Sequence, residues 1–382
     1  MTGVRTSMVY GLEEIFGSGT PMNEAWIAPP VGSYFNFTHS RSVTPLSAAG
    51  TKTWEKAAYG ALTGSWEWTF SMDYDYIEPL ALVFEDHSYD ASTKTHTFSK
   101  VNNGRIPSFT VRKKQLNRIT DSGVKDETVV LRGCVVRNMR ISKNAGSSEM
   151  SATLTGFYAS DTMTKGDLTS TDYKPYDGNL VEYACLFAGS IADNNYVANT
   201  ESLNISIENN SAANMSTCSP FAGSYFEGPT TYSFGTTCYS NDPAKYKQRL
   251  YSGGQTNTET SPKSKGMGPL SKMNIVSFNE EYRDRDAGIA TAVGKSTNHM
   301  VIGLEDVVFK SLTWQKGDGT KLMDQINGTN VRLITIEVKS QNAPGKDDLW
   351  KKTNPHCITY TPSEGTGGTT EGEEGGVQEP TA

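Results

Sequence analysis

The sequence predicts a mainly β protein, and two observations support this. Apolar and polar residues alternate over long segments, whereas no long segment has the period of an amphipathic helix. Gly, with 36 residues, and Tyr, with 18, are abundant beside Ser, Thr and Asn, a composition typical of strands joined by turns. With 382 residues, 36% of them hydrophobic, the chain is long enough for two or three domains with cores of their own.

The clearest strand pattern lies between residues 65 and 76. Side chains alternate between the two faces of a strand, so a two-residue rhythm predicts one core face and one solvent face. The rhythm breaks at Glu78 and Pro79, and because a proline after acidic residues is a common helix start, a short helix is expected to follow. The core face would hold Trp66, Trp68, Phe70, Met72, Tyr74 and Tyr76, and the solvent face Ser65, Glu67, Thr69, Ser71, Asp73 and Asp75.

Further strands are expected along the chain. Residues 129–158 predict a β-hairpin, with a polar turn at 143–148 between two alternating segments. In the second half, Leu203, Ile205 and Ile207 alternate with polar residues. Other strands are expected within residues 301–315 and 331–340.

Segments of the two halves also align in the same order, which predicts an internal duplication. Residues 129–146 align without a gap on 302–319, and residues 64–82 align on 228–246. Phe35 and Phe37 align on Ile205 and Ile207. The alternative is two unrelated β domains that share only a strand rhythm.

Composition shifts predict how the chain is divided. Polar, Gly-rich or Pro-rich stretches separate the alternating segments, and the C-terminal stretch from Pro362 carries five Glu and no basic residue. The expected parts are an N-terminal arm (1–30), a first domain (31–164), a linker (165–179), a second domain (180–345) with an exposed loop (251–271), and a C-terminal arm with a disordered acidic tail (346–382).

Charge and cysteine usage exclude several classes. The formal charge is −7 and no Lys/Arg stripe is present, so tight nucleic-acid binding is not expected. Five cysteines without a CxxC pair argue against a disulfide framework, although Cys218 and Cys238 could pair. The N-terminal residues lack the apolar region of a signal peptide, and no apolar stretch is long enough for a transmembrane helix, so neither is predicted.

Candidate chemistry is sparse. Asp73 and Asp75 form a D-x-D pair that on a strand would share one face and could hold a hard cation, but the favoured interpretation is that they continue the polar row of Ser65 and Glu67. The five histidines form no zinc-site spacing, and no phosphate-binding loop or nucleophile elbow is present. No enzyme activity, cofactor or metal is therefore predicted, while carboxylates brought together from distant positions stay possible.

Several phrases of the sequence come in a familiar order: VYGLEEIFGSG, GSYFNFTHSRS, GSWEWTFSMDYDYIEPLALVF, PSFTVRKK, LRGCVVRNMRISKNAGSSEMSATLTGFYAS and FAGSIADNNYVANTESLNISIENN. Over roughly residues 8–345 this layout resembles the tail tube (major tail) proteins of long-tailed phages and archaeal tailed viruses. The similarity is one of layout and short phrases and includes no catalytic signature.

The resemblance implies a β-sandwich or barrel with a short helix, whose long strands join those of neighbouring copies into a barrel around a lumen. Rings would stack into a hollow virion tail tube, assembled in the host cytoplasm, that conducts viral DNA. With two fused tube domains, three chains would form a pseudo-hexameric ring; without the duplication, six chains would. The implied partners are further copies of the chain, the tape-measure protein, tail terminator and baseplate proteins, and passing DNA bound without sequence specificity. No membrane partner is implied.

In a tube of this kind, the polar row of the first half would line the lumen or a subunit seam. The alternative is that this row is simple outer surface. Its members are Glu67, Thr69, Ser71, Asp73 and Asp75. An acidic or hydroxyl-rich wall suits a DNA conduit because it does not hold phosphates. The corresponding second-half residues, Thr231, Ser233 and Gly235, include no acid.

Two other classes stay open from the sequence. A cell-surface or S-layer-like β protein would share the composition but should carry a secretion signal. A carbohydrate-active β-sandwich enzyme would use paired carboxylates with exposed aromatic residues and would be a monomer with a pocket.

Overall fold

The computed structural model describes most of the chain between residues 8 and 358. The described residues are 8–46, 56–100, 105–120, 123–165, 179–188, 200–217, 219, 221–239, 271–278, 293, 296–308, 311–316 and 322–358. Predictions for residues 166–178 of the linker, 251–270 of the loop and 359–382 of the tail lie outside this part of the chain, as does the possible Cys218–Cys238 pair.

The prediction of a mainly β protein is confirmed. The first half contains β1 (Met8–Leu12), β2 (Trp26–Ile27), β3 (Tyr34–Leu46), β4 (Lys56–Ser71), β5 (Asp86–Asp90), β6 (Thr95–Ser99), β7 (Phe109–Thr120), β8 (Gly123–Asn144), β9 (Ser151–Tyr158) and β10 (Ser160–Lys165), with η1 (Met22–Glu24) and α1 (Glu78–Ala81). The second half contains β11 (Cys185–Ala188), β12 (Thr200–Glu208), β13 (Ala212–Met215), β14 (Ala222–Phe226), β15 (Thr231–Tyr239), β16 (Ser271–Phe278), β17 (His299–Val307), β18 (Ser311–Lys316), β19 (Leu322–Val331), β20 (Leu333–Lys339), η4 (Lys346–Asp348) and β21 (Cys357–Ile358).

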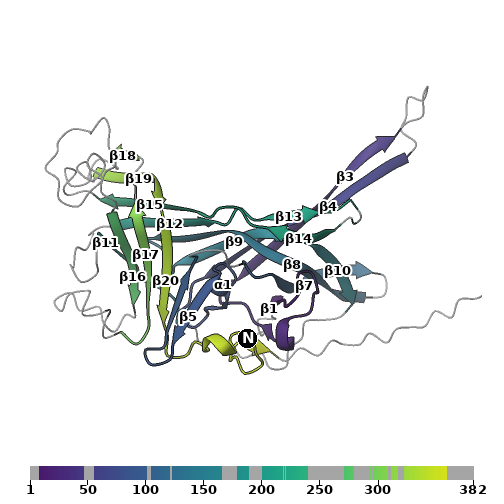
Figure 1. Ribbon diagram of the computed structural model, residues 1–382, viewed down its shortest axis with the longest axis horizontal. Coiled ribbons are helices and arrows are strands. Elements are labelled where there is room, and N and C mark those ends of the chain that lie inside the picture. The colour runs from purple at the N-terminus through teal and green to yellow at the C-terminus, as the bar shows by residue number, and fades with distance from the viewer. Residues whose placement is uncertain are drawn as a thin grey trace, which may run out of the picture.

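The strands form a large sheet, a smaller sheet and a short hairpin (Figure 1). The main path of the large sheet is β18-β19-β15-β12-β8-β7-β1-β2-β21, and β3, β4, β9 and β10 branch from it at β8. The six-stranded sheet has the order β11-β16-β17-β20-β6-β5, and β13 pairs with β14. The registered strand pairs are antiparallel, and such sheets bury one face while the other meets solvent.

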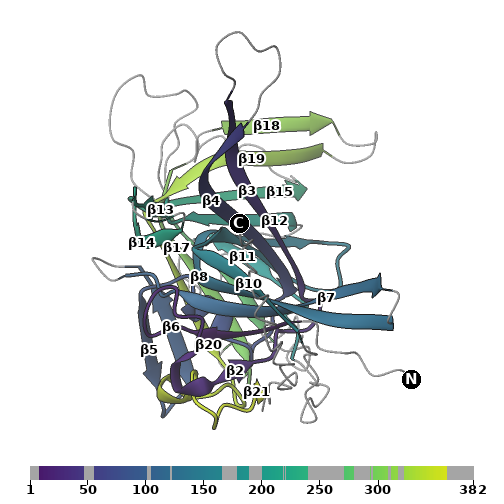
Figure 2. The same cartoon turned by 90° about the vertical axis from the view of Figure 1, so that its right-hand side faces the viewer.

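Strands from the two predicted domains are combined in both sheets. β12 of the second half pairs with β8 of the first, so the large sheet runs through both halves. The β5–β6 hairpin of the first half in turn pairs with β20 in the smaller sheet. Figure 2 shows the two sheets from the side. The core is likewise shared, because one cluster of buried side chains extends from Trp68 through Ile205 to Ile336.

The predicted strand at residues 65–76 is correct in its core face and too long at its end. All six even-numbered residues from Trp66 to Tyr76 are buried, and Trp68 makes an edge contact with Tyr10 at 4.8 Å between ring centroids. β4 nevertheless ends at Ser71, because beyond it the chain makes hydrogen bonds to Met150 and to residues 179–181 instead. The predicted short helix is confirmed as α1, with Glu78 and Pro79 in its first turn.

β8 changes partners along its length. Its first part pairs with β7 and β10, and its second part pairs with β9 and β12. The change follows Gly133, which has a φ of 63°, a left-handed conformation that glycine adopts without strain. In this way a single strand turns the corner between two parts of the sheet.

Both ends of the described chain pack on the body of the protein. β1, within the predicted N-terminal arm, pairs with β7, and Met8, Val9 and Tyr10 are buried. β21, within the predicted C-terminal arm, pairs with β2. Buried His356, next to β21, holds the Glu78 carboxylate of α1 at 2.8 Å, so residues 346–358 are attached to the first half.

Candidate assembly interface

Asp73 and Asp75 lie inside the chain and not on the polar face of β4. Both are buried, with 3% and 1% of their surface exposed. The Asp73 carboxylate accepts the backbone N–H of Asp75 at 2.8 Å. Asp75 itself accepts hydrogen bonds from Asn179 at 2.6 Å, from Asn342 at 3.4 Å and from the Ser340 hydroxyl.

These contacts give the acidic pair a structural role. Buried carboxylates are stable only when they are hydrogen-bonded, and the donors to Asp75 come from the last residue of the predicted linker and from the end of the predicted second domain. Within the described part of the chain, no group of three or more His, Cys, Asp or Glu side chains could hold a metal ion. Because solvent does not reach Asp73 or Asp75, they are not part of an exposed lumen or seam surface.

The other members of the predicted polar row differ in their exposure to solvent. Glu67 is exposed and Thr69 is half-buried on the face of β4 opposite the core. Ser71 is buried, because the segment at Val31 covers it and accepts its backbone N–H at 3.2 Å. Of the predicted row, Glu67 and Thr69 therefore remain accessible on a solvent-facing surface.

The polar face continues from the first half into the second. One cross-strand row runs through Thr69, Thr153, Arg140, Ser206 and Ser233, and a second runs through Glu67, Thr155, Asn138, Glu208 and Thr231. Hydroxyl groups bond across these strands, as in the pair of Thr69 and Thr153 at 3.0 Å. The predicted second-half residues Thr231 and Ser233 thus share a face with Glu67 and Thr69, and Arg140 makes that face mixed in charge.

The seam between the two halves is the pairing of β8 with β12. It runs from Asn138 opposite Glu208 to Asn144 opposite Ser202. Ile141 lies opposite Ile205, and both are buried, so the seam has an apolar side in addition to its backbone hydrogen bonds. The seam is a complete strand-to-strand joint between one half and the next.

A short hairpin, β13–β14, fastens this seam, and we call it the clasp. In the segment between β12 and β13, the Asn209 N–H donates to the Arg137 carbonyl at 2.8 Å and the Ser211 hydroxyl donates to the Val136 carbonyl at 3.1 Å. Its Tyr225 packs in one cluster with Val135 and Ile106 of the first half. The clasp therefore covers the corner of β8 with an aromatic side chain.

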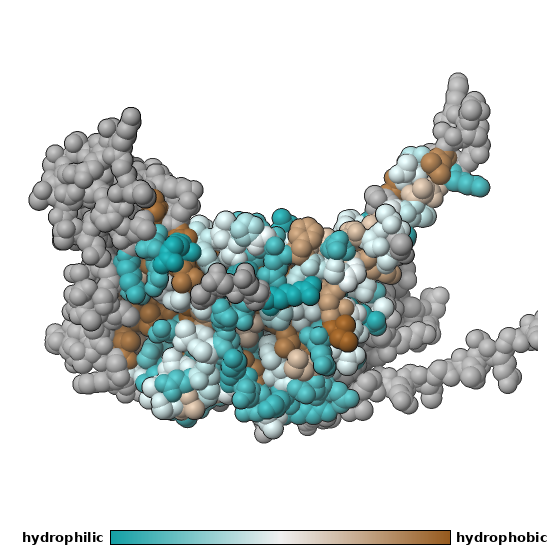
Figure 3. Space-filling view, viewed as in Figure 1, coloured by the Kyte–Doolittle hydropathy of each residue, from teal (hydrophilic) through white to brown (hydrophobic). Residues whose placement is uncertain are grey.

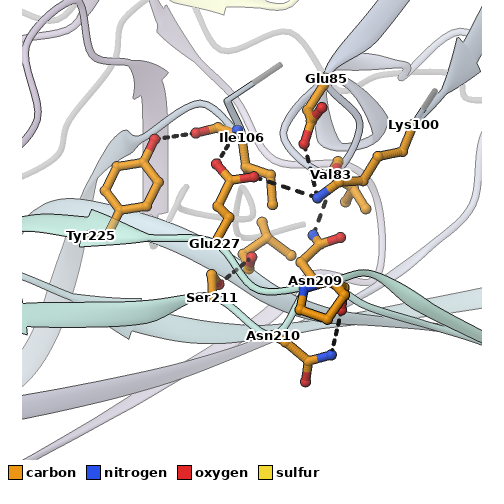
Figure 4. Close-up of polar contacts among 11 residues, drawn as sticks. Val83, Glu85, Lys100, Ile106, Asn209, Asn210, Ser211, Tyr225 and Glu227 are labelled. Atoms are coloured by element: carbon orange, nitrogen blue, oxygen red, sulfur yellow. Dashed lines mark hydrogen bonds and ion pairs between the residues drawn. The ribbon is translucent and has the colours of Figure 1, made fainter. Parts of the chain in front are cut away.

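Polar contacts hold β14, the second strand of the clasp, in place (Figure 4). The Tyr225 hydroxyl donates to the Ile106 carbonyl, and the Glu227 carboxylate accepts the Ile106 N–H at 2.6 Å. Lys100 lies between Glu85 at 2.9 Å and Glu227 at 3.5 Å. Burial raises the pKa of Glu227, while the Ile106 N–H and the Lys100 ammonium favour its charged form.

Two strand edges lie open at opposite ends of the molecule. Within the described residues β3 pairs with β4 alone and β18 pairs with β19 alone. In Figure 1 the β3–β4 hairpin projects at one end of the long axis, and β18 lies at the other. Open edges present unpaired backbone groups, so they pair readily with strands of another chain.

Exposed apolar side chains accompany these edges. Tyr59, Val43 and Leu46 lie on the outer part of the β3–β4 hairpin, where Tyr59 is 63% exposed. Val308, between β17 and β18, is 46% exposed. Figure 3 shows apolar atoms on the projecting hairpin.

Sequence reasoning missed the clasp. Residues 221–227 are short, broken by Gly223 and rich in aromatic residues, so their rhythm alone gives no partner. The available signal was the length of the segment between residues 208 and 231, which is longer than a tight turn requires.

Comparisons with known proteins do not assign the chain. No protein-family model matches it, and no curated protein matches it either. Among the described residues, no helix has the length and apolar character needed to cross a membrane.

Proposed function

We propose that the chain is a duplicated β unit whose copies join head to tail into a ring, and that stacked rings form a hollow tail tube of a virus particle. The register of the strands supports the duplication. Asp161 pairs with Leu131 in β10–β8, and Ile334 pairs with Leu304 in β20–β17. The same shift of 173 residues, from Leu131 to Leu304, carries each residue of the first pair to the second.

An irregularity in the neighbouring strand pair supports the same shift. In β7–β8 the register slips between the pairs Phe109–Cys134 and Val111–Leu131. In β16–β17 it slips between Ser271–Val307 and Met273–Leu304. Left-handed backbone occurs at corresponding positions too, at Gly133 and at Asp306. A shared bulge is stronger support than a shared rhythm, because bulges are specific local features.

The order of strands repeats as well. The first half has the neighbours β3-β4-β9-β8, and the second half has β12-β15-β19-β18. In this correspondence β12 is the counterpart of β3, and β18 is the counterpart of the second part of β8.

The proposal of a ring depends mainly on one observation about strand pairing. The joint between β8 and β12 exists once inside the chain. The two strands that would form the same joint again, β18 and β3, each pair with one other strand among the described residues. Pairing β18 of one copy with β3 of the next repeats the internal joint and leaves neither of these two edges open once the ring closes. Three chains then give six units, and six chains are the alternative.

The polar face of the joined sheet suits a conduit. Hydroxyls and charges of both signs, from Thr69 and Glu67 to Arg140 and Ser233, would line the lumen, while the apolar face packs on the core. A wall without a basic stripe does not hold phosphates, so DNA passes without sequence-specific binding. The partners of such a tube are the tape-measure protein, tail terminator and baseplate proteins, and its location is the virion tail.

Electron microscopy of the purified protein with mass measurement in solution tests this function. Hollow rings or tubes with three chains per ring are expected. Flat two-dimensional arrays would favour a cell-surface layer instead. A chain that stays monomeric at high concentration and binds a sugar in a defined pocket would contradict the proposal.

A further inference from the structure

The two long hairpins of the chain, β3–β4 and β12–β15, have a similar layout but differ in where their outer parts lie. The β3–β4 ladder slips between Arg41 and Val43, and beyond this irregularity lies a short outer part from the Val43–Tyr59 pair to the Leu46–Lys56 pair. The β12–β15 hairpin also has an outer part beyond a break, and this part is the clasp, from the Ala212–Phe226 pair to the Met215–Ala222 pair. The clasp is thus the counterpart of the outer β3–β4 hairpin.

The surfaces that these outer parts could cover also correspond. The clasp covers Val135, which is completely buried at the corner of β8. The 173-residue shift carries Val135 to Val308, at the corresponding corner between β17 and β18. Val308 is 46% exposed, so the corner of the second unit lacks the cover that the first has.

We propose that the outer part of the β3–β4 hairpin clasps the next copy of this chain at the Val308 corner, as β13–β14 clasps the Val135 corner within the chain. This inference rests on the proposed head-to-tail ring and adds the contact that locks it. The hairpin and the corner belong to the same two partners that the β3–β18 pairing joins, so the strand joint and the clasp form together.

The side chains of the two surfaces fit this occupant. Tyr59, Val43 and Leu46 on the hairpin are exposed, and an aromatic side chain against a valine repeats the internal contact of Tyr225 with Val135. Arg41 lies over the Tyr59 ring at 5.0 Å, as Arg105 lies over Tyr225 at 4.3 Å. Desolvated aromatic residues of this kind contribute much of the energy of protein interfaces.

A mixing experiment with two one-sided variants tests the clasp. Tyr59→Asp removes the hairpin side and Val308→Asp removes the corner side, and both residues are exposed, so the fold should be kept. Each variant alone should weaken the contact between copies by roughly ten- to a hundredfold. An equimolar mixture should stop at dimers, because only the hairpin of Val308→Asp and the corner of Tyr59→Asp remain able to bind.

The readout is sedimentation of each variant, of their mixture and of a control, Val31→Asp, which adds the same charge at another exposed valine near the base of the hairpin. The control should assemble like the wild type. Unchanged assembly of both one-sided variants would overturn the clasp and leave the ring standing. A wild-type chain that never assembles would instead overturn the ring and the clasp together.

Discussion

Single residues hold the turns of the first half in place, and Glu13 is the clearest case. It is buried, and its carboxylate accepts the backbone N–H groups of Gly17 at 3.0 Å, Gly19 at 3.0 Å and Gly133 at 3.1 Å. The Ser108 hydroxyl donates to it at 3.1 Å. One carboxylate thus joins the turn after β1, the start of β7 and the corner of β8.

We therefore expect Glu13→Gln to destabilise the protein by about 3 kcal/mol. The Gln side chain replaces one acceptor oxygen with an NH2 group, which would point at N–H donors and could not accept their hydrogen bonds. Chemical denaturation measures this change. Glu14→Gln, the same substitution at the exposed neighbouring residue, should stay within about 0.5 kcal/mol of the wild type. Equal losses for the two variants would contradict the role given to Glu13.

Two adjacent histidines on the β5–β6 hairpin, buried His96 and half-buried His87, predict a loss of stability in acid. His87 Nε2 and His96 Nδ1 lie 2.9 Å apart. Burial lowers the pKa of His96 to about 3 and that of His87 to about 4, from an ordinary value of 6.5. The unfolded chain then binds protons that the folded chain does not, so stability should fall as the pH drops from 6.5 towards 4.

His96→Phe should reduce this acid loss, because phenylalanine keeps the stacking on Tyr89 and does not titrate. Melting temperatures at about pH 7.5 and about pH 4.5 give the comparison. His39→Phe, at an exposed histidine on β3, should leave the difference between the two temperatures as it is in the wild type. An unchanged difference in His96→Phe would be evidence against the His87–His96 pair as its source.

Among whole elements, the clasp has the sharpest test. Tyr225 closes the cluster with Val135 and Ile106, whereas Phe226 beside it on β14 is 58% exposed. Tyr225→Ala should cost about 3 kcal/mol, in the range of large-to-small changes in cores, and Phe226→Ala should cost under about 1 kcal/mol. Denaturant titration followed by tryptophan fluorescence measures both. A reversed order would mean that the clasp does not hold the seam.

The sequence predicted elements where local pattern and packing agree. The alternation from Trp66 to Tyr76 located the core face correctly, and Glu78-Pro79 located α1. The same alternation did not reveal where β4 ends, because Asp73 is turned inward by backbone partners near Leu180, far along the chain. Long-range pairing decides such ends, and no local rhythm contains it.

At the scale of the molecule, the alignment of the two halves predicted matching segments but did not predict their arrangement. The gap-free alignment matched residues 129–146 with 302–319. Residues 129–144 belong to one strand, β8, whereas residues 302–316 include parts of two strands, β17 and β18. A sequence shows neither the corner in β8 nor the joint of β8 with β12. Both depend on contacts between residues far apart in the chain, and they are what the ring proposal rests on.

The pairing of β3 with β18 between copies is the central claim, and a disulfide tests it most directly. Arg140 of β8 pairs with Ser206 of β12. Under the proposed duplication their counterparts are Thr313 on β18 and either Asn36 or Thr38 on β3. Directly opposed residues of antiparallel strands are close enough for a disulfide. Oxidised Thr313→Cys/Asn36→Cys or Thr313→Cys/Thr38→Cys protein should give covalent species that end at a closed ring of three chains.

Ser65→Cys combined with Thr313→Cys is the control, because Ser65 lies opposite Thr38 on β4 and so one strand further from β18. It should form no bond between copies. The measurement is the mass of the oxidised products under denaturing conditions. Closed trimers from one of the β3 variants, with none from the control, are the predicted result; assembled particles in which neither β3 variant forms a bond would contradict the head-to-tail ring.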